Sequence, residues 1–137
     1  MRAILVAMIL AVGSYGSYEA LEAPSNQIFG QTLVHGPSDR HEVALTFDDG
    51  PNAPYTERIL DVLRRERVHA TFFVVGRAVA AYPRTVRRIV REGHVLGNHS
   101  WDHAHLLVET PSAVRAELRR TDDAIYAATG LRTRLMR

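Results

Sequence analysis

Three short apolar runs, each followed by a helical pattern, set the fold of this 137-residue chain. Residues 43–47, 70–75 and 94–98 have the length and the β-branched and aromatic content of buried strands. The helical patterns are one that Thr56 caps and that carries Ile59, Leu60 and Leu63, one from 83 to 93, and one from 110 to 130. Because helical crossovers between buried strands accompany parallel pairing, the order βαβαβα predicts a parallel sheet with helices on its faces.

The number of strands bounds the fold class. A closed barrel of parallel strands needs about eight, whereas this sequence supplies three, and residues 131–137 have the composition to begin a fourth. We therefore predict an α/β fold that starts like a barrel and is truncated after about three to four strands. Such a sheet has an open edge and an uncovered apolar face, which predicts self-association of the chain through that edge.

The N-terminal sequence indicates export. Residues 3–12 form an unbroken apolar run after a single arginine, and small residues follow at once. A run of ten is too short to cross a bilayer, which takes about 20 residues, but it is typical of a signal peptide. The alternative is an ordinary buried element of the fold. We predict a signal peptide or anchor over 1–22, an irregular lead-in over 23–40, and an incomplete catalytic domain over 41–137. The protein is then secreted or at the cell surface, and touches a membrane only through an uncleaved N-terminal segment.

Composition narrows the chemistry. Cysteine is absent, which excludes disulfides and leaves His, Asp and Glu as metal ligands. All 17 basic residues are arginine, and most lie on the predicted helices among apolar positions. No aromatic residues are spaced among them to stack on bases, so we interpret these clusters as solvated outer helix faces and expect no nucleic-acid partner.

Two adjacent acids follow the first predicted strand. Asp48 and Asp49 precede Gly50-Pro51, at the carboxyl end of a parallel strand, where active sites of such folds lie. Neighbours on an extended stretch point opposite ways, so one carboxylate can face a metal and the other a substrate water. The alternative interpretation is an Asp-Gly turn with a capping acid.

Two histidines follow the third predicted strand. His99 and His103 are four residues apart, which places them on one face of a helical turn and within reach of a single ion. Alone, the pair also fits surface or hydrogen-bonded histidines. Together with an aspartate it supplies three ligands, the number that a catalytic zinc site uses while one position stays open for water.

These motifs resemble those of the polysaccharide deacetylase family, the NodB-homology carbohydrate esterases. The resemblance rests on TFDDGP at 46–51, ATFFVVG at 70–76 and GNHSWDH at 97–103, and covers residues 41–137. It implies a distorted (β/α) barrel. It also implies a metal-dependent hydrolase that removes N-acetyl groups from N-acetylglucosamine units of chitin, chito-oligosaccharides or peptidoglycan.

The resemblance assigns residues by position. It implies that Asp48 is the general base. It also implies that Asp49, His99 and His103 are the ligands of a divalent metal, and we expect that metal to be zinc. Ser100 matches the residue that supports the loop between the histidines, and Arg137 falls where the family has an arginine that steadies the base. No residue matches the family's general acid. We expect Trp101 to pack beside the site and Arg77 to be a surface or loop residue.

Two alternatives stay open beside this interpretation. The chain is a non-catalytic remnant that binds metal or glycan without turnover, if the missing acid and pocket walls are truly lost. An aspartate-based phosphatase is disfavoured, because Asp48 and Asp49 are adjacent rather than separated by one residue, and no phosphate-binding glycine loop follows.

Overall fold

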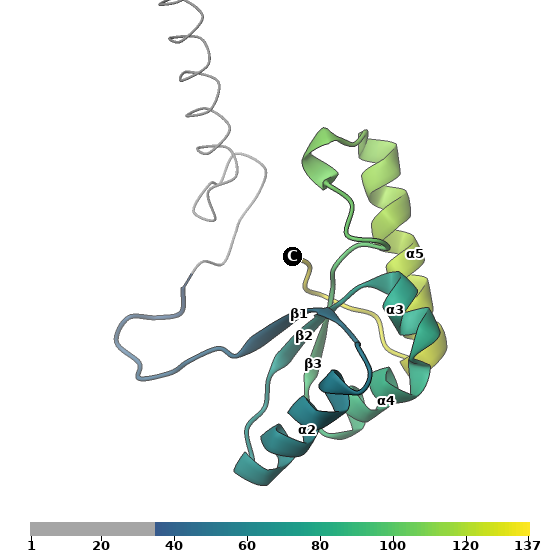
Figure 1. The fold of residues 1–137 in the computed structure, drawn as a ribbon. Helices are drawn as coiled ribbons and strands as arrows, with labels where there is room; N and C mark the ends of the chain where they lie inside the picture. Colours follow the sequence, from purple (N-terminus) through teal and green to yellow (C-terminus); the bar gives the residue numbers. More distant parts are fainter. Residues whose placement is uncertain (1–34) are drawn as a thin grey trace, which may run out of the picture. The chain divides into compact units, whose positions relative to one another are not determined.

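The computed structural model describes residues 35–137, and Ala44–Arg137 form one folded unit (Figure 1). Its elements are the strands β1 (Thr46–Gly50), β2 (Thr71–Val74) and β3 (Val95–Asn98), the helices α2 (Tyr55–Glu66), α3 (Gly76–Ala81), α4 (Pro83–Arg91) and α5 (Pro111–Thr129), and the single 3-10 turn η1 (Leu106–Val108). The predicted alternation of strands and helices is confirmed. The predicted signal peptide and most of the lead-in lie outside the described residues.

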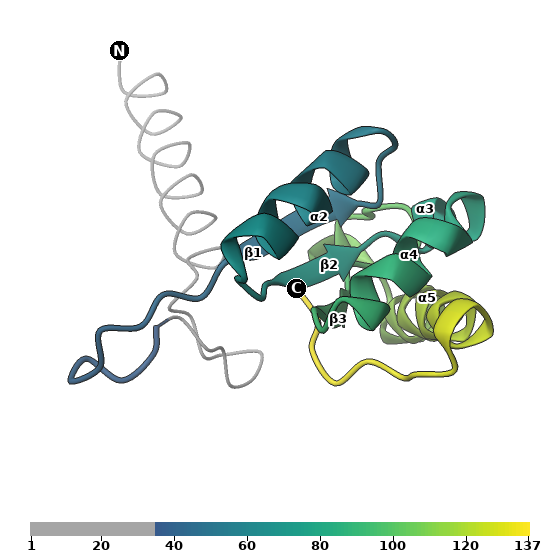
Figure 2. The same ribbon diagram turned by 90° about the horizontal axis from the view of Figure 1, so that it is seen from below.

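The three strands form a parallel sheet in the order β1-β2-β3. Helices α2, α4 and α5 pack together against one face of this sheet (Figures 1 and 2). Helices were predicted on both faces, but within residues 44–137 the opposite face has none, and Val95 of β3 is 49% exposed there. The sheet is therefore covered on one side only, and its three carboxyl ends meet at one edge.

The core lies between the sheet and its helices. Alternation along β2 points Phe72 and Val74 toward the helices, where they are buried against Ile89 of α4 and Ile125 of α5. Burying an aliphatic or aromatic side chain of this size contributes about 1.5–3 kcal/mol. This layer is the main hydrophobic core of the unit.

Some helix ends agree with the prediction from the sequence and others differ. Helix α5 has the predicted limits: Thr110 caps it by accepting a hydrogen bond from the Ala113 amide at 3.2 Å, and Gly130 ends it in a left-handed conformation. Thr56 does not cap α2, because the helix starts earlier and the Thr56 hydroxyl accepts from the Asn52 amide at 2.8 Å instead. Helix α3 was not predicted at all, since its six residues show no amphipathic period.

One arginine departs from the predicted solvated faces. The Arg88 side chain is 19% exposed and joins α4 to α2 through an ion pair of 2.6 Å with Asp61, while its Nε donates to Glu92 at 2.7 Å. The hydrogen bond from Arg88 lowers the pKa of the Asp61 carboxyl. The other arginines of the three helical clusters are exposed, as predicted.

The chain beyond α5 returns to the sheet. Met136 forms a parallel bridge with Asn98, and the Asn98 amide donates to the Leu135 carbonyl at 2.8 Å. The predicted fourth strand is thus present as a single bridge beside β3. Among the described residues, no helix combines the length and the apolarity that a bilayer crossing requires.

Candidate metal centre

The acids of β1 lie in a bulge. Phe47 pairs with Phe72 and Gly50 with Val74, so β1 has one residue more than β2 over this stretch. Asp49 has a left-handed φ of 67°. The two aspartate side chains do point to different partners, as expected. The reason given was wrong, because a bulge and not regular strand alternation sets the directions of the two side chains. A bulge of this kind was not readable from the sequence because Asp49 is not a glycine.

The histidines lie on a loop rather than a helix. Residues 99–103, which we call the metal loop, follow β3 without helical structure, and Ser100 and His103 have left-handed φ of 59° and 66°. The predicted helical turn is therefore wrong. Ser100 supports this shape, because its hydroxyl accepts from the His103 amide at 3.0 Å and its own amide donates to the Asn98 side chain at 3.0 Å.

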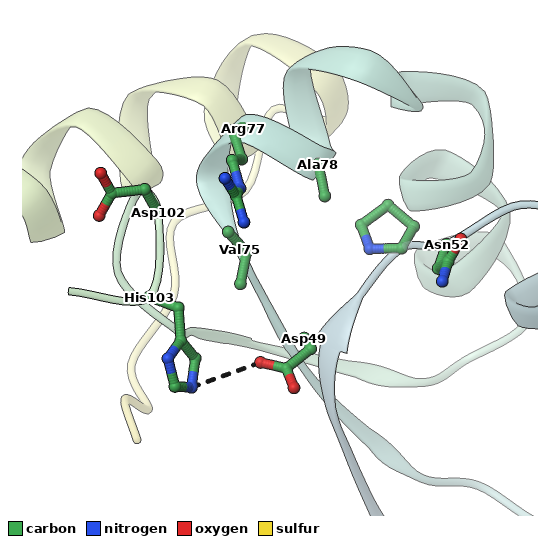
Figure 3. A pocket seen from close by; sticks show the side chains of 8 residues that line it. Asp49, Asn52, Val75, Arg77, Ala78, Asp102 and His103 are labelled. Carbon is green, nitrogen blue, oxygen red and sulfur yellow. Dashed lines mark ion pairs between the residues drawn. The ribbon is translucent and has the colours of Figure 1, made fainter. Parts of the chain in front are cut away.

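Asp49, His99 and His103 converge on one point. The Asp49 Oδ1 atom lies 3.3 Å from Nε2 of His99 and 3.5 Å from Nε2 of His103, and all three ligand atoms lie within 4.8 Å of one another. Figure 3 shows the Asp49 and His103 side chains facing each other. Strand β1 and the loop after β3, which are not neighbours in the sheet, together supply the cluster.

A hydrogen bond orients His99 for ligation. Its Nδ1 atom lies 2.6 Å from the backbone oxygen of Arg137. A backbone oxygen only accepts, so Nδ1 carries the proton and Nε2 keeps its lone pair toward Asp49. Two imidazole nitrogens and one carboxylate oxygen form a donor set that divalent transition metals favour, so these residues fit a divalent metal.

Asp48 has a different partner. Its Oδ2 atom lies 3.4 Å from the Arg137 guanidinium, which also donates to the Thr46 hydroxyl at 3.2 Å. The guanidinium lies 5.6 Å from the centre of the Phe73 ring. The two predicted site residues Asp48 and Arg137 are therefore brought together beside the cluster, although 89 positions separate them in the chain.

An open hollow of about 600 Å³ adjoins the cluster (Figure 3). It is lined by Asp49, Pro51, Asn52, Val75, Arg77, Ala78, Asp102 and His103. Arg77 was expected at the surface; it is exposed, yet it lines this hollow. The sequence analysis did not assign Arg77 to the site, although its place just after β2, level with the motifs after β1 and β3, is a signal that could have done so.

Comparison with protein family models shows which family the chain matches. The family described as polysaccharide deacetylase matches residues 35–137, which include every residue of the cluster. The chain belongs to the polysaccharide deacetylase family. The resemblance stated from the three motifs is thereby confirmed.

Two relatives of this deacetylase family show the range of named activities. A peptidoglycan-N-acetylglucosamine deacetylase of Bacillus cereus is 39% identical over 102 residues, which cover 74% of this chain and 37% of that protein. A chitooligosaccharide deacetylase of Rhizobium leguminosarum bv. trifolii is 46% identical over 91 residues, covering 66% and 42%. The chain thus spans well under half the length of these relatives.

Solved structures of the family share the fold. A peptidoglycan N-acetylglucosamine deacetylase superposes with a TM-score of 0.72 at 39% identity, over 74% of this chain and 47% of that chain. A family 4 acetyl xylan esterase from Clostridium thermocellum, solved with a cobalt ion, gives a TM-score of 0.66 at 38% identity, over 68% and 46%. The α/β fold of the deacetylases is therefore shown for these residues.

Proposed function

We propose that this protein is a metal-dependent hydrolase that removes N-acetyl groups from a glycan containing N-acetylglucosamine, such as chitin, a chito-oligosaccharide or peptidoglycan. The observation that carries the proposal is the convergence of Asp49, His99 and His103 within 4.8 Å, beside Asp48, at the carboxyl ends of the strands. The names of the relatives support the substrate class.

Zinc is the metal that we propose. Two histidine nitrogens and one carboxylate oxygen are a ligand set that catalytic zinc sites use, and the Asp49 carboxylate lies 3.3 Å and 3.5 Å from the two histidine nitrogens. When bound, zinc supplies a positive charge that activates water and polarises a carbonyl oxygen. The three side chains leave one side of the cluster open to the hollow, where a substrate acetamide has room to enter.

The remaining roles follow from the contacts of each side chain. Asp48 pairs with Arg137 and is not one of the three grouped ligands, so we assign it as the base that takes a proton from the attacking water. Arg137 orients that carboxylate. Ser100 holds the loop between the two histidines. We assign no general acid among the described residues.

The three strands also support a proposal on the whole fold. Sequential parallel strands, each returning through a helix on the same side, are the start of a (β/α) barrel. We propose that β1, β2 and β3 are the first strands of the distorted barrel that the resemblance implies. The parallel bridge between Asn98 and Met136, beside β3, supports this proposal.

Replacing one ligand tests the metal site. We expect His103→Ala to weaken zinc binding by at least a hundredfold, because it removes one of three protein ligands, and to abolish acetate release from an N-acetylated chito-oligosaccharide. Isothermal titration with zinc and an acetate assay measure the two effects. His105→Ala is the matched control, since His105 is exposed two residues beyond the loop. Unchanged zinc affinity in His103→Ala would refute the ligand assignment.

The same experiment separates catalysis from binding. A wild-type chain that binds zinc and releases no acetate from chito-oligosaccharide or peptidoglycan would support the alternative of a protein that binds metal or glycan without turnover. Loss of both zinc binding and acetate release in His103→Ala supports the hydrolase.

We further propose that the protein is exported. The proposal rests on the apolar run at residues 3–12 and the small residues that follow it. The intact mass of the protein recovered outside the cell measures this directly. A mass reduced by about the first 22 residues is expected, and retention of the full chain in the cytoplasm would contradict it.

A further inference from the structure

We propose that Glu117 of α5 is a positioning residue for the metal loop, and that it sets metal affinity by holding the peptide between the two histidine ligands. The proposal rests on the metal site proposed above. Its evidence is a set of contacts that connect the loop to α3 on one side and α5 on the other.

The Glu117 carboxylate binds the middle of the loop. Its Oε2 atom accepts a hydrogen bond from the Trp101 amide at 2.9 Å, across 16 positions of sequence. Trp101 lies midway between His99 and His103, so this bond fixes the backbone that carries both ligands. An acceptor on a 19-residue helix is rigidly placed.

The neighbouring carbonyls are held from the other side. The Gly76 amide donates to the Ser100 carbonyl and the Arg77 amide donates to the Trp101 carbonyl, both at 3.0 Å. These donors are the first two residues of α3. The Trp101 peptide unit is therefore bound through its amide by α5 and through its carbonyl by α3.

Close packing leaves the loop little freedom to move. A Cβ added to Gly76 would lie 2.5 Å from the Trp101 ring and 2.6 Å from the Thr121 hydroxyl. The Arg120 guanidinium stacks on the Trp101 ring, 3.7 Å from its centre. Helix α3, the metal loop and α5 thus form one contiguous contact, in which α5 supplies the carboxylate and the stacked cation.

The loop needs this support because of its backbone. Ser100 and His103 both adopt left-handed φ without being glycine, and such conformations persist only when the surroundings enforce them. If the Trp101 amide loses its acceptor, we expect the loop to relax and the His103 imidazole to leave its position 3.5 Å from Asp49. The effect on metal binding is indirect, since Glu117 does not touch the ligand atoms.

Three substitutions of Glu117 test whether the length or the charge of its side chain matters for zinc binding. Glu117→Gln keeps an oxygen at the same distance and removes the charge, whereas Glu117→Asp keeps the charge and is too short to reach the Trp101 amide. We expect Glu117→Ala and Glu117→Asp to weaken zinc binding by about 10–100-fold, as the loss of a hydrogen bond that holds metal ligands in place does. We expect Glu117→Gln to stay near wild type. Asp123→Ala on the same helix is the matched control, because Asp123 is exposed and pairs only with Arg132 among the described residues.

The visible absorption spectrum of bound Co²⁺ reports the arrangement of the metal ligands, and general destabilisation of the fold would not change it. With Co²⁺ in place of zinc, we expect the visible bands of Glu117→Asp to shift and those of Glu117→Gln to match wild type. Equal zinc affinity and equal spectra in wild type and Glu117→Asp would overturn the proposal, as would equal damage in Glu117→Gln. Should Glu117→Ala not fold, the comparison of Asp with Gln decides. Loss of binding in His103→Ala with none in Glu117→Asp refutes this inference alone, and no effect in either variant refutes the metal site itself.

Discussion

At the scale of single residues, the bulge in β1 directs the side chains of the adjacent aspartates to different partners. Asp49 faces the histidines and Asp48 faces Arg137. We therefore expect Asp48→Asn to lower the rate of acetate release by about 10²–10⁴-fold, the usual contribution of a general base, while zinc affinity stays within about twofold of wild type. Acetate release and zinc titration on the same preparation check this. Loss of zinc binding in Asp48→Asn would show that Asp48 is a ligand instead.

A buried histidine predicts how stability depends on pH. His94 is 7% exposed, and its Nδ1 accepts from the Ala70 amide at 3.3 Å. Burial lowers the pKa of His94, and the facing His69 and Arg88 add to the effect against the opposing charge of Glu92. The unfolded chain therefore takes up a proton near pH 6.5 that the folded chain refuses, so stability is highest above that pH and falls as the pH drops below it.

Replacing His94 measures how much this histidine contributes to the pH dependence of stability. In His94→Asn an amide oxygen can still accept from Ala70 but does not titrate, so we expect the free energy of unfolding to fall less between pH 7 and pH 5 than in wild type. Urea denaturation at several pH values measures the slope. His105→Asn, at an exposed position, should keep the wild-type slope. An identical slope in His94→Asn would contradict the account.

Site residues were predictable from the sequence, whereas their backbone was not. The types and order of Asp48, Asp49, His99 and His103 indicated a metal site, and the structure brings the last three together. The left-handed conformations of Asp49, Ser100 and His103 were missed because local propensity disfavours them. The loop that carries Ser100 and His103 is held by hydrogen bonds to α3 and α5, which no local stretch of sequence contains. Glu117 was missed for the same reason, since nothing in its own helix marks it as a partner of the loop.

At the scale of elements, Arg88 joins helices α4 and α2, a contact that the sequence pattern did not predict. Its guanidinium reaches Asp61 of α2 and the half-buried Glu92 beyond α4. We expect Arg88→Ala to reduce the free energy of unfolding by about 1–3 kcal/mol, because it leaves Glu92 without its charged partner in a poorly solvated position. Urea denaturation against Arg87→Ala, an exposed neighbour on the same helix, checks this. Equal stability of the two variants would show that the pairs contribute little.

Strands and long helices were predictable because their patterns are local. Apolar runs ended by Gly or Pro marked β1 and β2, and Thr110 and Gly130 marked the limits of α5. Helix α3 was missed because tertiary contacts stabilise it: Gly76 packs against Thr121 of α5 too closely for any side chain. Short elements of this kind depend on neighbours that no local window of sequence contains.

At the scale of the whole molecule, the order of strands followed from the sequence, but the distribution of helices did not. Because every connection between strands contains a helix, we predicted parallel pairing of the strands, and the strands are parallel. Periodicity shows that a helix has an apolar face without showing which side of a sheet it covers. Here α2, α4 and α5 share one side, and the other side carries the half-exposed Val95 of β3 together with Phe73 of β2, which is buried.

This uncovered side predicts association between copies of the 137-residue chain. Val95 lies on the same face as Gly97 and Phe73, opposite the helices, and β1 has one edge unpaired within residues 44–137. Apolar surface beside an open edge favours contact with a second copy, so we expect sedimentation velocity to show dimers or larger species at micromolar concentration. Val95→Lys should shift the population toward monomer, because a charge on this face must lose water on association. Val62→Lys is the control, since Val62 has similar exposure but lies on α2; equal effects of the two substitutions would place the contact elsewhere.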